Sequence, residues 1–156
     1  MAHLIWTDNL DTGIAVIDGQ HRQIVDFINQ LDDAQATGDR ELIGEVIEGL
    51  VDYTLSHFAF EETLMEDSGY EYLRGHKKVH ELFVRRVAEF QEKFKAGEDV
   101  AGGLHRLLSR WLFNHIRNDD SAYVPAVKPK MTVLVEEKDE GGWLSRTLGR
   151  FFGSHS

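Results

Sequence analysis

Five histidines and three carboxylates of this chain stand at spacings that suit metal binding. They occur in four short segments: His21 alone, His57 with Glu61, His76 with His80, and His115 followed by Asp119 and Asp120. Residues four apart on an α-helix differ by about 40° around its axis and about 6 Å along it, so two such side chains can reach one metal cluster. Imidazole and carboxylate groups bind iron, zinc, copper and manganese. The pattern therefore predicts a metal site.

Four amphipathic helices are expected to present these residues. Apolar side chains recur at helical spacing over residues 19–37, 40–67, 72–96 and 99–124. Asp18 is the predicted N-cap of the first helix, Gly38 its predicted end, and the fourth is expected to end before Pro125. No strand pattern competes in this region, and the connections are short. The expected fold is an all-α, antiparallel up-down-up-down four-helix bundle.

Every candidate ligand falls at one end of such a bundle. In an antiparallel arrangement the starts of the first and third helices lie beside the ends of the second and fourth, and the ligand segments occupy those positions. Seven ligands are too many for one zinc ion, which usually takes four. Five imidazoles and two bridging carboxylates fit a pair of octahedral-leaning ions with one open position. The residues therefore point to two iron ions.

The order of these motifs resembles that of the hemerythrin family, in particular the single-domain bacterial type called bacteriohemerythrin. The family pattern is a single His, then His-x-x-x-Glu, His-x-x-x-His and His-x-x-x-x-Asp, and every position is present here. Trp6 near the start and the run Ile17-Asp18-Gly19-Gln20-His21 also match. The resemblance covers residues from about 4 to 125.

The resemblance implies a di-iron centre with a solvent-derived oxo or hydroxo bridge that binds dioxygen. It assigns one iron to three histidines, the other iron to two, and both bridges to carboxylates: His76, His80 and His115; His21 and His57; and Glu61 and Asp120, respectively. It selects Asp120 over Asp119, although Asp119 stands nearer the His115 face of an ideal α-helix. A loosened helix end would be needed there.

The resemblance also implies an oxygen pocket lined by apolar side chains: Ile24, Phe58, Trp111, Leu112 and Ile116. By spacing alone these are ordinary core residues, and both interpretations are compatible. A dry pocket without proton donors favours the release of intact oxygen over its cleavage.

Three functions remain open, in a fixed order of preference. The first is reversible dioxygen binding for transport, storage or delivery, without catalysis. The second is an oxygen or redox sensor that signals through the C-terminal tail. The third is a di-iron oxidase or peroxidase, which the histidine-rich ligand set disfavours because such enzymes use Glu-x-x-His pairs. A zinc protease is disfavoured because Lys77 stands where its general base would be needed.

Composition narrows the class of protein further. The chain has 156 residues, no cysteine and a formal net charge of −10. These values exclude disulfides and thiolate metal sites, and they disfavour nucleic-acid binding. With no secretory signal and no membrane-spanning run, we expect a cytoplasmic protein, most simply a monomer.

The chain is expected to divide into a bundle over residues 1–125, with an arm over 1–17, and a tail over 126–156. Residues 130–135 form an apolar, β-branched run of uncertain structure. Residues 143–152 have apolar positions on one face, which predicts a short amphipathic helix. This helix either folds back onto its own bundle or docks on a partner, and a protein partner is favoured over a membrane surface because the segment has only two basic residues.

Overall fold

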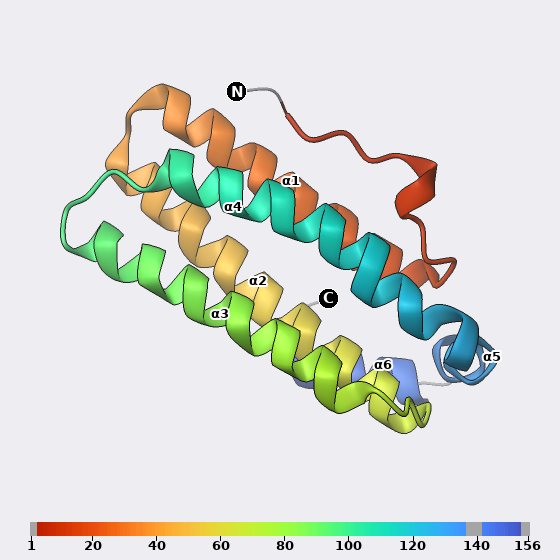
Figure 1. Ribbon diagram of the computed structural model, residues 1–156. Helices are drawn as coiled ribbons and strands as arrows, with labels where there is room; N and C mark the ends of the chain where they lie inside the picture. The colour runs from red at the N-terminus through yellow and green to blue at the C-terminus, as the bar shows by residue number, and fades with distance from the viewer. Residues whose placement is uncertain (1–2, 137–141, 154–156) are drawn as a thin grey trace.

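The computed structural model describes residues 3–136 and 142–153. Its long helices are α1 (Ala15–Thr37), α2 (Arg40–Asp67), α3 (Leu73–Lys95) and α4 (Ala101–Asn114). Figure 1 shows that successive helices run in opposite directions, which confirms the predicted all-α, up-down-up-down bundle. A π-helix, η2 (His115–Asp120), continues α4 directly into α5 (Ser121–Glu136), and α6 (Trp143–Phe152) packs against α2 and α5.

The first helix begins earlier than the sequence predicted. Its N-cap is Ile14, and Asp18 lies inside the first turn. The Asp18 carboxylate accepts hydrogen bonds from the backbone N–H and the hydroxyl of Thr12, at 2.8 and 2.7 Å, and from the Gly13 N–H at 3.1 Å. The prediction of Asp18 as N-cap was wrong because this carboxylate satisfies donors of the preceding arm. The predicted end at Gly38 is confirmed, with φ at 70° in the left-handed region.

The fourth helical segment does not end before Pro125, which corrects the prediction. The chain stays helical through Pro125 and Pro129 to Glu136, so the run of uncertain structure is also helical. Each proline removes a backbone donor, and this normally disfavours a helix interior. Here Tyr123, Val127 and Met131, spaced four apart, are all buried on one face. Their packing overrides the local preference of the prolines.

Two apolar clusters stabilise the molecule. The larger one runs along the inside of the bundle from Leu10 to Ile116. The smaller one lies at the end of the bundle that holds the ligand segments, where α5 and α6 cover Phe60, Leu64 and Met65 of α2. The second cluster therefore supports the helix that supplies His57 and Glu61.

The predicted amphipathic helix over residues 143–152 is confirmed as α6. Its apolar face lies against the bundle, because the rings of Trp143 and Phe152 contact Phe60 at 5.5 and 6.0 Å between centroids. The indole N–H of Trp143 donates a hydrogen bond of 2.6 Å to Asp67. In the part of the chain that the structure describes, no helix is both long and apolar enough to cross a bilayer.

The N-terminal arm runs alongside the bundle toward the ligand end (Figure 1). Leu4 exchanges two hydrogen bonds with the Asn29 side chain, at 2.8 and 3.1 Å, and Trp6 packs against the main core. Ile5 points outward and is 76% exposed. A single extended strand turns alternate side chains to opposite sides, so Leu4 and Trp6 are covered and Ile5 is not.

Candidate metal centre

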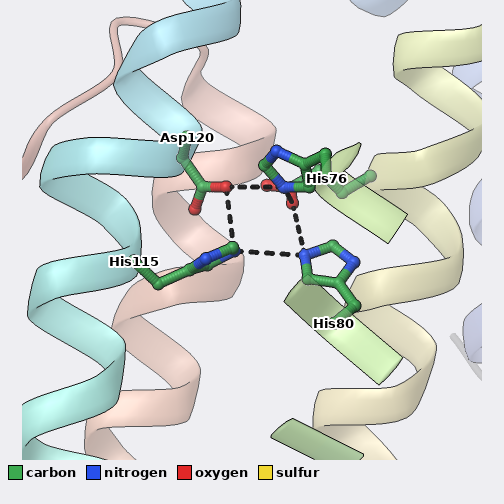
Figure 2. A group of neighbouring side chains, drawn as sticks. His76, His80, His115 and Asp120 are labelled. Carbon is green, nitrogen blue, oxygen red and sulfur yellow. Dashed lines mark hydrogen bonds and ion pairs between the residues drawn. The ribbon is translucent and has the colours of Figure 1, made fainter. Parts of the chain in front are cut away.

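The five histidines and two carboxylates of the family pattern converge in one buried cluster. They form two overlapping groups that share a carboxylate: Glu61, His76, His80, His115 and Asp120; and His21, His57 and Glu61. All seven side chains are buried, with Glu61, His21 and Asp120 completely enclosed. Figure 2 shows His76, His80, His115 and Asp120 pointing toward one another across the bundle. The helix ends predicted to meet therefore do meet.

Each carboxylate has one oxygen on either side of the cluster. Glu61 Oε1 lies 2.9 and 3.2 Å from the Nε2 atoms of His76 and His80, whereas Glu61 Oε2 lies 3.9 and 3.7 Å from those of His21 and His57. Such a carboxylate can join two metal ions, one held by each histidine group.

The second carboxylate has the same two-sided geometry. Asp120 Oδ1 lies 3.1 Å from Nε2 of both His76 and His115, and Oδ2 lies 3.1 Å from Nε2 of His21. With Glu61, Asp120 therefore gives two parallel links between a three-histidine side and a two-histidine side.

A π-helical turn brings Asp120 into the site. In residues 115–120 the backbone bonds span five residues. This wider turn places Asp120, five residues after His115, beside its Nε2 atom. Asp119 lies on the other side of the ring, where it accepts a hydrogen bond of 2.8 Å from Nδ1. The expected loosening exists, but it lies within a continuous helix and not at a helix end.

Three polar side chains fix the orientation of the imidazoles. Nδ1 of His57 lies 2.6 Å from Gln20 Oε1, and Nδ1 of His80 lies 2.8 Å from Glu62 Oε2. Together with the bond from His115 to Asp119, these contacts occupy Nδ1 and leave Nε2 facing the centre of the cluster. Neutral imidazoles held in this way are preorganised metal ligands.

Burial and neighbouring charges set the protonation of the metal-free cluster. Burial lowers the pKa of His57 to about 3 despite the Glu61 charge. Burial acts in the same direction on His76, but hydrogen bonds with Asp120 and Glu61 outweigh it and raise this pKa to about 10. The pKa of His115 is raised to about 9, because the charge of Asp120 and its hydrogen bonds outweigh burial. Protons on two imidazoles thus balance two carboxylates.

The cluster fits metal ions better than it fits protons. Both nitrogens of His21 and both oxygens of Asp120 are buried without a hydrogen-bond partner among the described residues. Nε2 atoms of His80 and His115 lie only 3.1 Å apart, an arrangement that places two acceptors together when both rings are neutral. A cation between these atoms satisfies all of them, and binding it displaces the protons.

Comparison with known proteins gives the family. The model of the hemerythrin HHE cation binding domain matches residues 12–127. The bacteriohemerythrin of Pseudomonas aeruginosa (strain LESB58) is 65% identical over 153 residues, covering 98% of this chain and all of that protein. The chain belongs to the hemerythrin family. The site is therefore the di-iron centre with which hemerythrins bind dioxygen.

More distant hemerythrins share the fold. The bacteriohemerythrin of Methylococcus capsulatus (strain Bath) is 40% identical over 129 residues, covering 81% of this chain and 98% of that protein. A solved structure of wild-type hemerythrin is 38% identical, with a TM-score of 0.76 over 81% of this chain and 98% of that one. Both leave the C-terminal part of this chain uncovered to a similar extent.

The hemerythrin site also contains a hydroxyl group that the sequence analysis missed. Tyr123 is fully buried, and its O–H donates a hydrogen bond of 3.0 Å to Glu61 Oε2. Burial raises the Tyr123 pKa well above its usual value, so the phenol keeps its proton. It holds the carboxylate oxygen that faces the two-histidine side.

The orienting residues were missed as well, although the sequence contained a signal for them. Gln20, Glu62 and Asp119 each stand directly beside a predicted ligand in the chain. The contact of Glu62 is with an imidazole from a different helix. A polar residue next to a ligand in a buried helix segment is thus a candidate partner for another ligand.

The residues predicted for an oxygen pocket occupy two kinds of position in this hemerythrin. Ile24, Phe58, Leu112 and Ile116 are buried in the main core. The Phe58 ring stacks on His80 at 3.9 Å between centroids. Trp111 is only partly buried and stacks on His115 at 4.3 Å. Apolar side chains therefore enclose the ligand rings from the bundle interior.

Proposed function

We propose that this hemerythrin is a dioxygen carrier or store that binds and releases oxygen intact. The observation that carries the proposal is the ligand set, in which five oriented imidazoles and two shared carboxylates meet in an enclosed cluster. When bound, the two iron ions supply the electrons with which dioxygen is held reversibly. The rest of the function belongs to the side chains of the bundle.

We assign the ligands as the two-sided geometry suggests. His76, His80 and His115 would hold one iron, because each lies within 3.2 Å of the same oxygen of at least one shared carboxylate. His21 and His57 would hold the other iron, next to the opposite oxygens. The two-histidine side has fewer protein ligands, so the open position for dioxygen is assigned there.

The surrounding side chains support binding without cleavage. Ile24, Phe58, Leu112 and Ile116 exclude water from the interior side of the cluster, and we assign them, with Trp111, to the oxygen pocket. The nearest hydroxyl, that of Tyr123, donates to Glu61 and retains its proton. A dry site without a ready acid disfavours protonation and loss of a bound oxygen species.

The test follows visible absorption through cycles of oxygenation. Protein with about two irons per chain, as a bridged pair requires, is reduced without oxygen, exposed to air and then purged with argon. We expect a charge-transfer band that appears with air and disappears under argon over several cycles. Steady consumption of oxygen and reductant, without a recoverable oxygenated form, would show an oxidase instead.

A sensor is the second candidate, and one contact favours it. Phe60 stands between His57 and Glu61 on α2, and its ring touches Trp143 and Phe152 of α6. A shift of α2 on oxygen binding would therefore reach the tail, which would then act on a protein partner through residues 143–152. Hydrogen exchange in α6, compared between reduced and oxygenated protein, tests this function. Identical protection in both states argues against it.

A further inference from the structure

A polar groove lies between α3 and α4, outside the oxygen pocket. It has a volume of about 650 Å³ and is lined by ten residues besides the ligand His115: Arg86, Phe90, Gly103, Arg106, Leu107, Arg110, Trp111, Asn114, Asn118 and Asp119. Its floor thus includes a predicted iron ligand and the carboxylate that orients it. No part of the proposed oxygen chemistry uses this groove.

Three arginines give the groove a positive charge in an acidic protein. Arg86, Arg106 and Arg110 are exposed, and none of them has an ion-pair partner within residues 3–136 and 142–153. Other basic groups of the chain are paired, such as Arg22 with Asp11 at 3.1 Å. The single carboxylate in the lining, Asp119, already accepts a hydrogen bond from His115. Unpaired guanidinium groups at this place, within a chain of net charge −10, suit an acidic ligand.

Trp111 connects this groove to the metal centre. One face of its indole stacks on His115 at 4.3 Å and 16°, and the other face stacks on Phe83 at 3.8 Å and 22°. The ring also lines the groove. An electron that arrives at the groove would thus pass from one aromatic ring to one iron ligand, which is a short and continuous contact path.

We propose that this arginine groove is the docking site for an acidic one-electron carrier protein that re-reduces the di-iron centre. The inference rests on the proposed function, since a carrier that oxidises irreversibly to the diferric state must be reduced to work again. Two reduced carriers would each give one electron, so the diferric centre becomes diferrous and two carriers become oxidised. An oxo bridge would take up one solvent proton and become hydroxo. The electrons tunnel through Trp111 and His115, and no bond of the chain forms or breaks.

The geometry favours a protein over a small planar cofactor. Both faces of the Trp111 ring are covered, so a flavin or a nucleotide base has no open indole face on which to stack. The arginines come from two helices and stand on both sides of the groove, which matches a broad acidic surface. Charge complementarity of this kind steers association and fixes orientation.

The experiment separates docking from electron transfer by using reduced plant-type ferredoxin as the acidic carrier. Binding of oxidised ferredoxin to the iron-loaded protein is measured by calorimetry at low salt. Reduction of the diferric protein is followed by stopped-flow absorption under argon. For the double variant Arg106→Glu/Arg110→Glu we expect the affinity and the second-order rate to fall by about tenfold or more, with a weaker salt dependence.

The matched control has the same change in charge at another place. Lys128→Glu/Lys130→Glu alters two exposed residues of α5 outside the groove, and should leave both measurements near wild type. For Trp111→Leu we expect normal ferredoxin binding but a lower ratio of the reduction rate with ferredoxin to that with dithionite. Trp111→Phe, which keeps a ring on His115, should restore most of this ratio.

Three results would overturn the proposal. The first is an equal loss in the groove variant and the α5 control, since that would reflect net charge alone. The second is tight binding of inorganic phosphate in the groove without any binding of ferredoxin, which would indicate a small-anion site. The third is a wild-type protein that binds oxygen reversibly after dithionite treatment but is not reduced by ferredoxin. In that case the inference fails while the proposed function stands.

Discussion

At the scale of single residues, the adjacent aspartates after His115 have different tasks. Asp120 is completely buried among the Nε2 atoms of three histidines, whereas Asp119 accepts a hydrogen bond from Nδ1 of His115 and reaches the surface. The backbone makes this separation through one π-helical turn. Without that turn, two neighbouring carboxylates could not serve both edges of one imidazole.

Replacing these aspartates should therefore have unequal effects. Asp120→Ala should reduce the iron content well below two per chain, because a shared carboxylate is lost. Asp119→Ala should still load two irons but hold them about 10–100-fold more weakly, as expected for a residue that orients a ligand. Elemental analysis and the rate of iron loss to a chelator measure the two effects. The reverse order would show that Asp119 is the bridging residue.

Leu112 provides a test of the dry pocket. Leu112→Ala should open space beside the cluster, admit water and speed the conversion of the oxygenated form to the diferric form. Leu104→Ala is the matched control, since Leu104 is fully buried in the same helix but about 16 Å from His115 along its axis. Both variants should lose about 2–5 kcal/mol of stability. Equal conversion rates in the two variants would make Leu112 plain core.

At the scale of secondary structure, the four helices and the ligand positions could be predicted from the sequence. Helical periodicity and the positions of Gly38 and the short connections determine the antiparallel order, and that order places His21, His57, His76 and His115 at one end. These signals are local, so they are readable without a structure.

The parts that were not predicted depend on contacts between elements. The π-turn differs from an α-turn by one residue and leaves no mark in apolar periodicity. The helix through Pro125 and Pro129 depends on the burial of Tyr123 and Met131 against α2, which local propensity cannot reveal. The hydrogen bond from Tyr123 to Glu61 joins residues 62 positions apart.

The tail helix α6 should stabilise the molecule without supplying the metal site. A chain that ends at residue 140 should keep about two irons and reversible oxygen uptake, since every assigned ligand lies before that residue. Its Tm should fall by several degrees, at about 2–4 °C per kcal/mol for a chain of this size, because Phe60 loses its cover. Thermal unfolding followed by circular dichroism measures this change.

Full-length Trp143→Ala is the companion variant, because it removes only the anchor of α6. It should reproduce most of the loss in Tm. Loss of iron in either variant would show that the tail is needed to form the site, and an unchanged Tm in both would show that its packing contributes nothing measurable.

At the scale of the whole molecule, the cluster couples folding to pH. The pKa of His76 is raised to about 10 and that of His115 to about 9, against an unfolded value of 6.5. The folded metal-free chain thus binds more protons than the unfolded chain between about pH 6.5 and 10, so its stability should fall as pH rises through this range. Urea midpoints at several pH values, with and without iron, measure this dependence.

The iron-loaded protein is the control for this pH dependence. Its imidazoles are occupied by metal, so it should show little change over the same pH range. A metal-free chain that is equally stable at pH 7 and pH 10 would show that His76 and His115 do not hold these protons in the folded state.

The spread of the ligands along the chain has a consequence for biosynthesis. The first assigned ligand is His21 and the last is Asp120, so ligands come from four helices and from the π-turn. Proteins emerge from the ribosome N-terminus first and fold in that order. Nascent chains that stop before Asp120 can hold at most an incomplete site, and we expect stalled chains of that length to retain no bridged iron pair. The 23-residue α1 must therefore wait for a partner made nearly one hundred residues later, and iron delivery is timed by translation of the fourth helix.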